Sequence, residues 1–184
     1  MRRGTMQTGS MIAIAALAVL AASTAQAGEA GGKTLILEAV GRITPQCDMG
    51  GLGDVDFGDL TRRGLATHAR FGLSCNVPFD INLRSANGGL AHETLPRGQG
   101  PFSGLAAYRL SIDVPLVAGQ GGQGGSASGA FTSRQLQAGQ MISSRGGVAF
   151  DGGRLSIEMM EPEGAGLLAG RYRETVEISL VPRL

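Results

Sequence analysis

The chain carries its clearest strand pattern in the stretch GRYRETVEISLVP, residues 170–182. Apolar side chains alternate there with polar ones, and the apolar ones are Tyr172, Val176, Ile178 and Leu180. A period of two residues is typical of a strand that is buried on one face. Pro182 is expected to end the strand because proline cannot donate a ladder hydrogen bond. The sequence stops two residues later, so we expect the neighbours of this strand to come from earlier in the chain or from another molecule.

Several shorter segments before this strand show the same alternation. Glycine supplies 31 of the 184 residues, well above the usual ~7%, and it follows no collagen-like period. The glycine-rich and glutamine-rich stretch at 119–129 is predicted to be a long flexible loop. Short strands separated by many turns indicate an all-β sandwich. The predicted strands cover residues 67–75, 79–83, 105–114 and 154–159, with a further apolar segment at 147–150.

The N-terminus has the three parts of a secretory signal peptide. Arg2 and Arg3 precede an apolar run over residues 11–22, and Ala25-Gln26-Ala27 follows as a small-residue cleavage site. The apolar run is about a dozen residues long, whereas a transmembrane helix needs ~20, so we expect no membrane anchor. We therefore predict a signal peptide over 1–27, an N-terminal extension over 28–42 and one β-sandwich domain over 43–184.

The extension is unusually apolar. Leu35, Leu37 and Ala39 share one parity, whereas Ile36 and Val40 share the other, so neither face is polar. The simplest interpretation is an ordinary first strand that is buried on both sides.

Cys47 and Cys75 are the only cysteines in the chain. An even cysteine count in an exported protein predicts a disulfide, and two cysteines allow one pairing. Zinc binding is the alternative, but a structural zinc site needs four ligands. The alternation over 67–75 turns Cys75 toward the core, where Cys47 could reach it.

Charge and motifs exclude several functional classes. Without Arg2 and Arg3 the chain has 14 basic and 15 acidic residues and no basic cluster, which argues against nucleic acid as a partner. The sequence contains no nucleophile elbow and no zinc-protease motif. His68 and His92 are expected to be solvated surface residues. We therefore expect no enzyme activity, no catalytic residues, no metal site and no cofactor.

Four motifs in order make the region from Ile43 to Leu184 resemble the spore coat protein U domain family, whose members are similar to subunits of archaic chaperone-usher pili. The motifs are Cys47 followed by Phe57-Gly58, Cys75 at the end of an alternating strand, Tyr108-x-Leu110-x-x-Asp113, and Gly170-x-Tyr172-x-Glu174-Thr175-Val176. Ser111 and Glu174 differ from the residues that the family often has at these positions, an aromatic residue and Asp.

The resemblance implies an immunoglobulin-like β-sandwich that lacks its final strand. A periplasmic chaperone would first supply that strand, and the N-terminal extension of the next subunit would then replace it. Leu35, Leu37 and Ala39 would belong to the donor strand, and the strand over 172–180 would border the acceptor groove. The implied function is that of a structural subunit of a secreted surface fibre, with an outer-membrane usher and neighbouring subunits as further partners. A secreted or tip-located binding module and a self-complemented monomer remain as alternatives.

Overall fold

The computed structural model describes residues 34–117 and 125–183, so the predicted signal peptide lies outside the described residues. The chain divides into two units, residues 1–41 and residues 42–184, and each is described by itself. In the first unit, residues 34–41 form neither helix nor strand and every side chain is exposed, with Leu35 at 95% and Leu37 at 88%. The expectation of an ordinary buried strand in the extension is therefore wrong.

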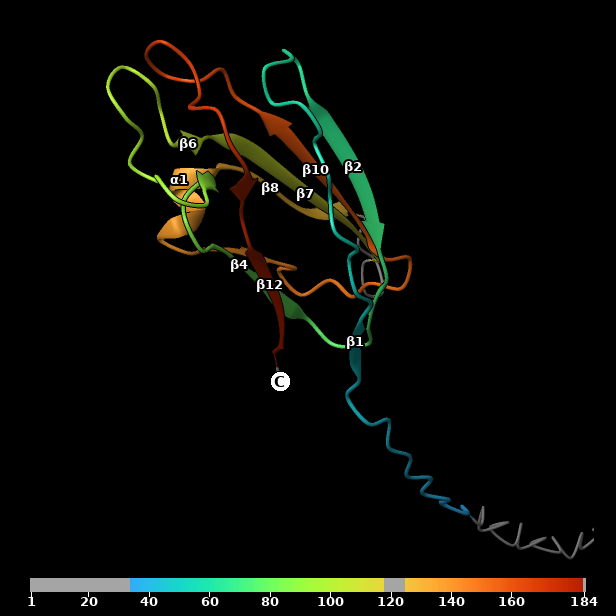
Figure 1. Cartoon of the computed structure of the whole chain (residues 1–184). Helices are drawn as coiled ribbons and strands as arrows, with labels where there is room; N and C mark the ends of the chain where they lie inside the picture. Colours follow the sequence, from blue (N-terminus) through green and yellow to red (C-terminus); the bar gives the residue numbers. More distant parts are fainter. Residues whose placement is uncertain (1–33, 118–124, 184) are drawn as a thin grey trace, which may run out of the picture. The chain divides into compact units, whose positions relative to one another are not determined.

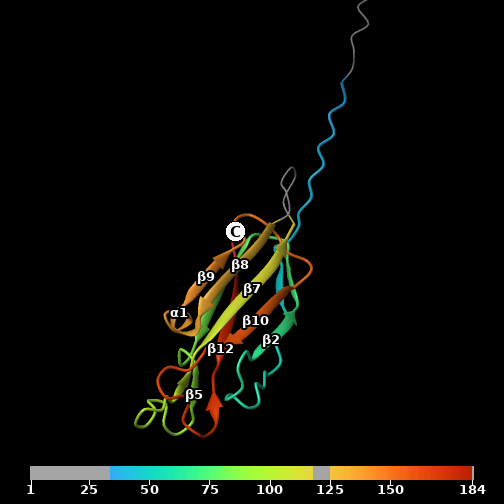
Figure 2. The ribbon, with the colours of Figure 1, turned by 90° about the horizontal axis from the view of Figure 1, so that it is seen from above.

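Two antiparallel sheets enclose the core of the second unit, so the predicted all-β sandwich is confirmed (Figure 1). Figure 2 shows the four strands of the first sheet side by side, with β12 behind them. The first sheet has the order β2 (Ala66–Phe71), β10 (Gly153–Met159), β7 (Tyr108–Leu116) and β8 (Gly125–Thr132). The second has the order β12 (Val176–Pro182), β4 (Phe79–Ser85) and β9 (Gln140–Ser143).

The core lies between these sheets and follows the predicted alternation. Every second residue of β7 is buried, and every second residue of β4 packs against it. Burying such aliphatic side chains stabilises the fold by roughly 1.5–3 kcal/mol each. The buried side chains of the two strands are Leu110, Ile112 and Val114 from β7 and Phe79, Ile81 and Leu83 from β4.

A third, small sheet covers one end of the sandwich. Its order is β11 (Tyr172–Arg173), β5 (Leu90–His92) and β6 (Leu105–Ala106). His92 lies in this sheet and is only 7% exposed, so its expected place on the solvated surface is wrong. Its Nδ1 accepts hydrogen bonds from the backbone N–H groups of Thr94 and Leu95, and its Nε2 donates to the carbonyl oxygen of Ala169 at 3.1 Å. His68, by contrast, is exposed on β2 as predicted.

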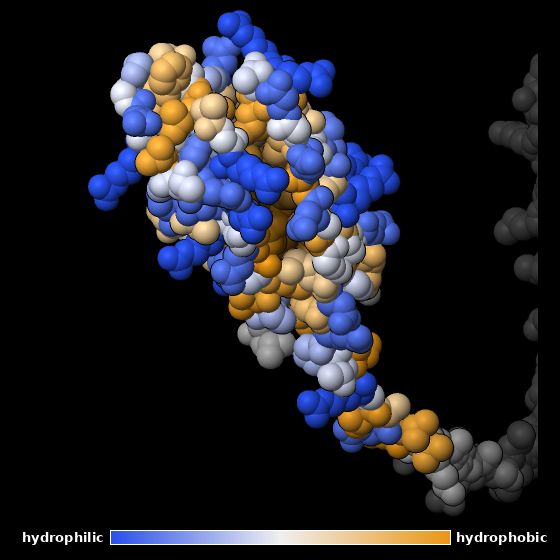
Figure 3. All heavy atoms as spheres, in the orientation of Figure 1, coloured by the Kyte–Doolittle hydropathy of each residue, from blue (hydrophilic) through white to orange (hydrophobic). Residues whose placement is uncertain are grey.

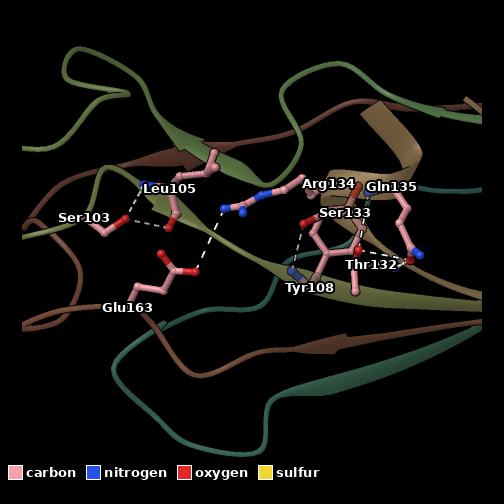
Figure 4. Close-up of polar contacts among 8 residues, drawn as sticks. All are labelled: Ser103, Leu105, Tyr108, Thr132, Ser133, Arg134, Gln135 and Glu163. Carbon is pink, nitrogen blue, oxygen red and sulfur yellow. Dashed lines mark hydrogen bonds and ion pairs between the residues drawn. The ribbon is translucent and has the colours of Figure 1, made fainter. Parts of the chain in front are cut away.

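Residues 125–129 do not belong to the long loop that their composition predicts. They form the first part of β8, which pairs with β7 along its whole length. The strand leads into a five-residue helix, α1 (Ser133–Gln137), which sequence periodicity did not reveal. Thr132 and Gln135 cap this helix reciprocally, and the backbone N–H of Tyr108 donates to Ser133 Oγ (Figure 4). Within the described residues no helix has the length and apolar character needed to cross a membrane.

The predicted disulfide between Cys47 and Cys75 is confirmed. Cys47 starts β1 (Cys47–Met49) and Cys75 ends β3 (Leu73–Cys75), and the two residues face each other in this antiparallel pair. Cys75 is fully buried in the core. The disulfide thus attaches the chain that follows Cys47 to the end of the sandwich.

We expect the double variant Cys47→Ala/Cys75→Ala to lose about 3.5 kcal/mol of unfolding free energy, because the bridge closes a loop of 28 residues in the unfolded state. Urea unfolding measures the loss. The wild-type chain in reducing buffer should show the same midpoint as the double variant. Equal stability of the oxidised wild type and the double variant would contradict a stabilising role for the bridge.

Candidate functional site

The C-terminal stretch forms two strands with different partners. β11 pairs with β5, whereas β12 pairs with β4 over its full length. Glu174 and Thr175 lie between them, so the prediction of one uninterrupted strand is wrong at these residues. The alternation of half-buried and exposed side chains nevertheless continues through the break. Glu174 is half-buried, and so are the apolar residues at the same parity, which are Tyr172, Val176, Ile178 and Leu180.

A carboxylate holds the break between the two strands in place. One oxygen of Glu174 accepts hydrogen bonds from Ser85 Oγ at 2.8 Å and from the Gly89 N–H at 2.9 Å. The other accepts from the backbone N–H groups of Thr175 at 2.7 Å and Asn87 at 3.2 Å. Hydrogen bonds to an ionised group are stronger than neutral ones. Glu174 therefore joins the start of β12 to the turn that follows β4.

Among the described residues, β12 has a hydrogen-bonding partner strand on one edge and none on the other. The backbone groups of Thr175 and Arg183, at either end of β12, bond to residues that flank β4. Because backbone groups alternate in direction along an antiparallel strand, those of Val176, Ile178 and Leu180 point away from β4. No strand in the described part of the chain pairs with that edge.

A groove of about 620 Å³ lies beside this edge, between β12 and the first sheet. Figure 3 shows the hollow on this face, with hydrophobic residues deep inside it and hydrophilic residues around it. Ala69 and Leu155 line the far wall at one end, and Tyr108 lines it toward the other. The lining side chains from the terminal stretch include Tyr172, Val176 and Ile178. Three of the four residues predicted for an acceptor groove therefore line this one, and Leu180 continues the same row of β12.

The open side of the groove is bordered by residues 51–57, the cyan segment between β1 and β2 in Figure 1. Val55 and Phe57 alternate with the exposed residues Asp54 and Asp56, which is a strand pattern. Nevertheless, the backbone groups of residues 51–57 make no hydrogen bond to the rest of the described chain. The groove thus has an unpaired backbone on both of its sides.

The candidate donor residues Leu35, Leu37 and Ala39 belong to the N-terminal unit. All three are exposed. Their side chains gain nothing from burial in this state, although burying a leucine contributes roughly 1.5–3 kcal/mol.

Covering the groove would stabilise the domain noticeably. Tyr172, Val176, Ile178 and Leu180 are already half-buried, so a new neighbour adds about half of the ~1.5–3 kcal/mol per side chain that full burial gives. The gain is of order 3–6 kcal/mol, which is a large part of the ~5–15 kcal/mol by which a domain is stable.

Comparison with known proteins gives one structural likeness. No family model and no curated protein matches the sequence. Two chains of solved structures match. One is from the crystal structure of the CsuC–CsuE chaperone–tip adhesion subunit pre-assembly complex of the archaic chaperone-usher Csu pili of Acinetobacter baumannii, at 16% identity and a TM-score of 0.32. The match covers 76% of this chain and 40% of that chain, so this chain corresponds to less than half of its neighbour.

Glu174 and Tyr108 are site residues whose roles the alternation pattern does not reveal. The Tyr108 side chain is 1% exposed, and its hydroxyl has no hydrogen-bond partner among the described residues. Burial raises the pKa of Tyr108 to about 12; the nearby Ser85 side chain acts in the opposite direction, and the negative charge of Glu174 contributes to the rise. Burial also raises the pKa of Tyr172, whose hydroxyl donates to the carbonyl oxygen of Leu168 at 2.7 Å.

We expect Tyr108→Phe to be at least as stable as the wild type at pH 7, because it removes a buried hydroxyl without a partner. Above pH 10 the unfolded state releases the Tyr108 proton while the folded state keeps it up to about pH 12, so the wild type loses stability over this range. The variant should lose less. Urea unfolding at pH 7 and pH 11 measures both effects. Tyr172→Phe is the control, and it should be less stable at pH 7 because its hydroxyl bond is lost.

Glu174→Ala should lower the unfolding free energy by about 3 kcal/mol, since it leaves the Ser85 hydroxyl and the Gly89 N–H buried without an acceptor. Glu177→Ala is the matched control, because Glu177 is exposed on the outer face of β12 and should change stability by less than about 0.5 kcal/mol. Thermal and urea unfolding of both variants measure the difference. Equal losses of unfolding free energy in the two variants would show that the hydrogen bonds of the Glu174 carboxylate do not stabilise the connection between β11 and β12.

Proposed function

We propose that this protein is a structural subunit of a surface fibre, in which the N-terminal extension of one copy fills the groove of the next. The observation that carries the proposal is the groove itself, which has an apolar interior and an unpaired backbone on both sides. A strand fits such a site because it supplies backbone donors and acceptors to both sides and side chains to the interior. A compact small molecule could occupy the volume, but it would leave most of the backbone groups unpaired.

The extension has the properties that the occupant needs. β12 spans the seven residues Val176–Pro182, and residues 35–41 of the extension have the same length. Leu35, Leu37 and Ala39 provide the alternate apolar side chains that the interior requires. Because these side chains are exposed, insertion gains their burial in addition to the cover that it gives the groove.

A subunit with an empty groove needs protection before assembly, because an exposed strand edge beside apolar side chains promotes aggregation. We propose that a periplasmic chaperone lends a strand to the groove and that an outer-membrane usher exchanges it for the extension of the next subunit. The signal-peptide pattern over 1–27 supports export through the periplasm to the cell surface. In this role the protein is not an enzyme and uses no cofactor.

Deleting residues 33–40 tests the exchange of strands. The deletion variant keeps the groove but has no strand to donate, so it should accept a wild-type extension and end the growing fibre. Adding it to wild-type subunits should shorten the fibres in proportion to its fraction, as measured by electron microscopy and light scattering. The control variant keeps residues 33–40 and changes only the exposed Glu38 to Gln. It should leave the fibre length unchanged.

Two outcomes of this experiment would overturn the proposal. Fibres of normal length from the deletion variant alone would show that the extension is not the donor. A wild-type chain that stays monomeric at all concentrations would also overturn it. In that case, loss of stability in the deletion variant would indicate a self-complemented monomer, and unchanged stability would indicate a binding module.

A further inference from the structure

We propose that the outer face of the first sheet binds a polysaccharide that carries carboxylate groups, with Arg70 and Arg154 holding one carboxylate between them. Figure 2 looks onto this face. The groove lies on the inner side of the same sheet. Binding on the outer face therefore neither uses the groove nor depends on the assembly of fibres.

Two arginines stand side by side on this face. Arg70 on β2 lies directly opposite Arg154 on β10, and both side chains are exposed. Like charges that lie directly opposite each other destabilise a sheet. None of the ion pairs in the described part of the chain includes either arginine. An anion placed between the two guanidinium groups would remove the repulsion and use their hydrogen-bond donors.

An open cavity of about 380 Å³ beside the arginines is lined by further donors. His68 pairs with Ser156 in the neighbouring row of the sheet, and both line the cavity together with Arg70 and Arg154. Guanidinium, imidazole and hydroxyl groups all offer N–H or O–H donors. Such a set suits a ligand rich in acceptor oxygens, and a carboxylate can bind an arginine through two parallel hydrogen bonds.

Asp113 on β7 favours an acidic sugar over a simple anion. It lies opposite Arg154, on the side away from Arg70, and it lines the same cavity. Its carboxylate repels a free phosphate, but it accepts hydrogen bonds from hydroxyl groups. A uronic acid carries a carboxylate and hydroxyl groups on one ring. It therefore matches the arginines and Asp113 at the same time.

The polar row crosses the whole sheet, which suits a chain of sugars. Arg70, Arg154, Asp113 and Ser128 follow one another in register on the four strands. Neighbouring strands lie ~4.8 Å apart, so the row is about 14 Å long and exceeds one sugar ring. Nucleic acid fits less well, because no Phe, Tyr or Trp lines the cavity and single-stranded bases are commonly held by stacking on such rings.

Titration of the full-length mature chain with decagalacturonate tests the proposal. The matched ligand is the fully methyl-esterified decamer, which keeps the ring hydroxyls and lacks the charge. Isothermal titration calorimetry should show at least tenfold tighter binding of the acid than of the ester. Equal binding of the two decamers would overturn the proposal, because no carboxylate would then be recognised.

Substitution of single arginines tests the site. Arg70→Gln and Arg154→Gln should each weaken the binding of decagalacturonate at least fivefold. Arg84→Gln is the matched control with the same change of net charge, because Arg84 is exposed on β4 in the other sheet, and it should weaken binding less than twofold. Equal weakening by all three would show attraction by net charge alone and would overturn the site.

Thermal unfolding verifies that these variants are folded. Arg70→Gln should be at least as stable as the wild type, because it removes a like charge opposite Arg154. The comparison of acid and ester uses the wild type only, so it stays decisive if a variant does not fold.

Asp113→Ala and two further ligands test the chemical class. The variant removes the acceptor for ring hydroxyls and the charge that repels phosphate, so the preference for decagalacturonate over inorganic phosphate should fall at least fivefold. An unchanged preference would overturn the role of Asp113. Tighter binding of a ten-nucleotide oligothymidylate than of decagalacturonate would assign the face to nucleic acid and overturn the proposal.

Binding on this face can be separated from the proposed function. The extension contributes no residue to the lining of the cavity. The variant that lacks residues 33–40 should therefore bind decagalacturonate like the wild type, whether or not fibres form. Loss of binding in this variant would overturn the location of the site.

Discussion

The unpaired edge of β12 is the constraint on which the rest of the structure depends. In a closed sandwich, the backbone groups of Val176, Ile178 and Leu180 would bond to a further strand, and the side chains of these residues would be fully covered. Here the same residues are half-buried, and Val176 and Ile178 line a groove. Water can satisfy the backbone groups of this edge but gives its apolar side chains no cover, whereas another strand provides both hydrogen bonds and apolar cover. The geometry of the edge therefore specifies the chemistry of its partner.

Two local interactions keep the groove open and in shape. The Cys47–Cys75 disulfide attaches the start of the bordering segment 51–57 to the core at one end. Glu174 attaches the start of β12 to the turn after β4 at the other end. Neither interaction closes the gap between the segment and β12. Because both borders are held without the occupant, insertion need not order them first, and less of the binding energy is spent on ordering.

Sequence patterns predicted the strands whose side chains alternate, because parity is a local property of the chain. β4, β7 and β12 are of this kind, and the sandwich follows from them. β8 was missed because Gly125, Ser126, Ser128 and Gly129 carry no apolar alternation, and its strand depends on pairing with β7. The role of Glu174 was hidden for a similar reason: apart from the adjacent Thr175, its hydrogen-bond donors Ser85, Asn87 and Gly89 lie more than 80 residues away in the sequence. Apolar content in the extension predicted a strand buried on both sides, and this prediction is wrong because residues 34–41 are exposed and form no strand.

In the proposed assembly, the two borders of the groove would account for the two apolar faces of the extension. A strand inserted beside β12 turns Leu35, Leu37 and Ala39 toward the core, and this leaves Ile36 and Val40 on its outer face. An ordinary edge strand would carry polar residues there. On this side, however, the segment 51–57 exposes Leu52 and Val55, which are 37% and 39% accessible. In the proposed assembly, apolar residues on the outer face of the insert would lie nearest to these side chains, so one strand would cover the core and the border together. A one-sided apolar strand would cover only the core, so the proposed assembly step would use both apolar faces of the extension.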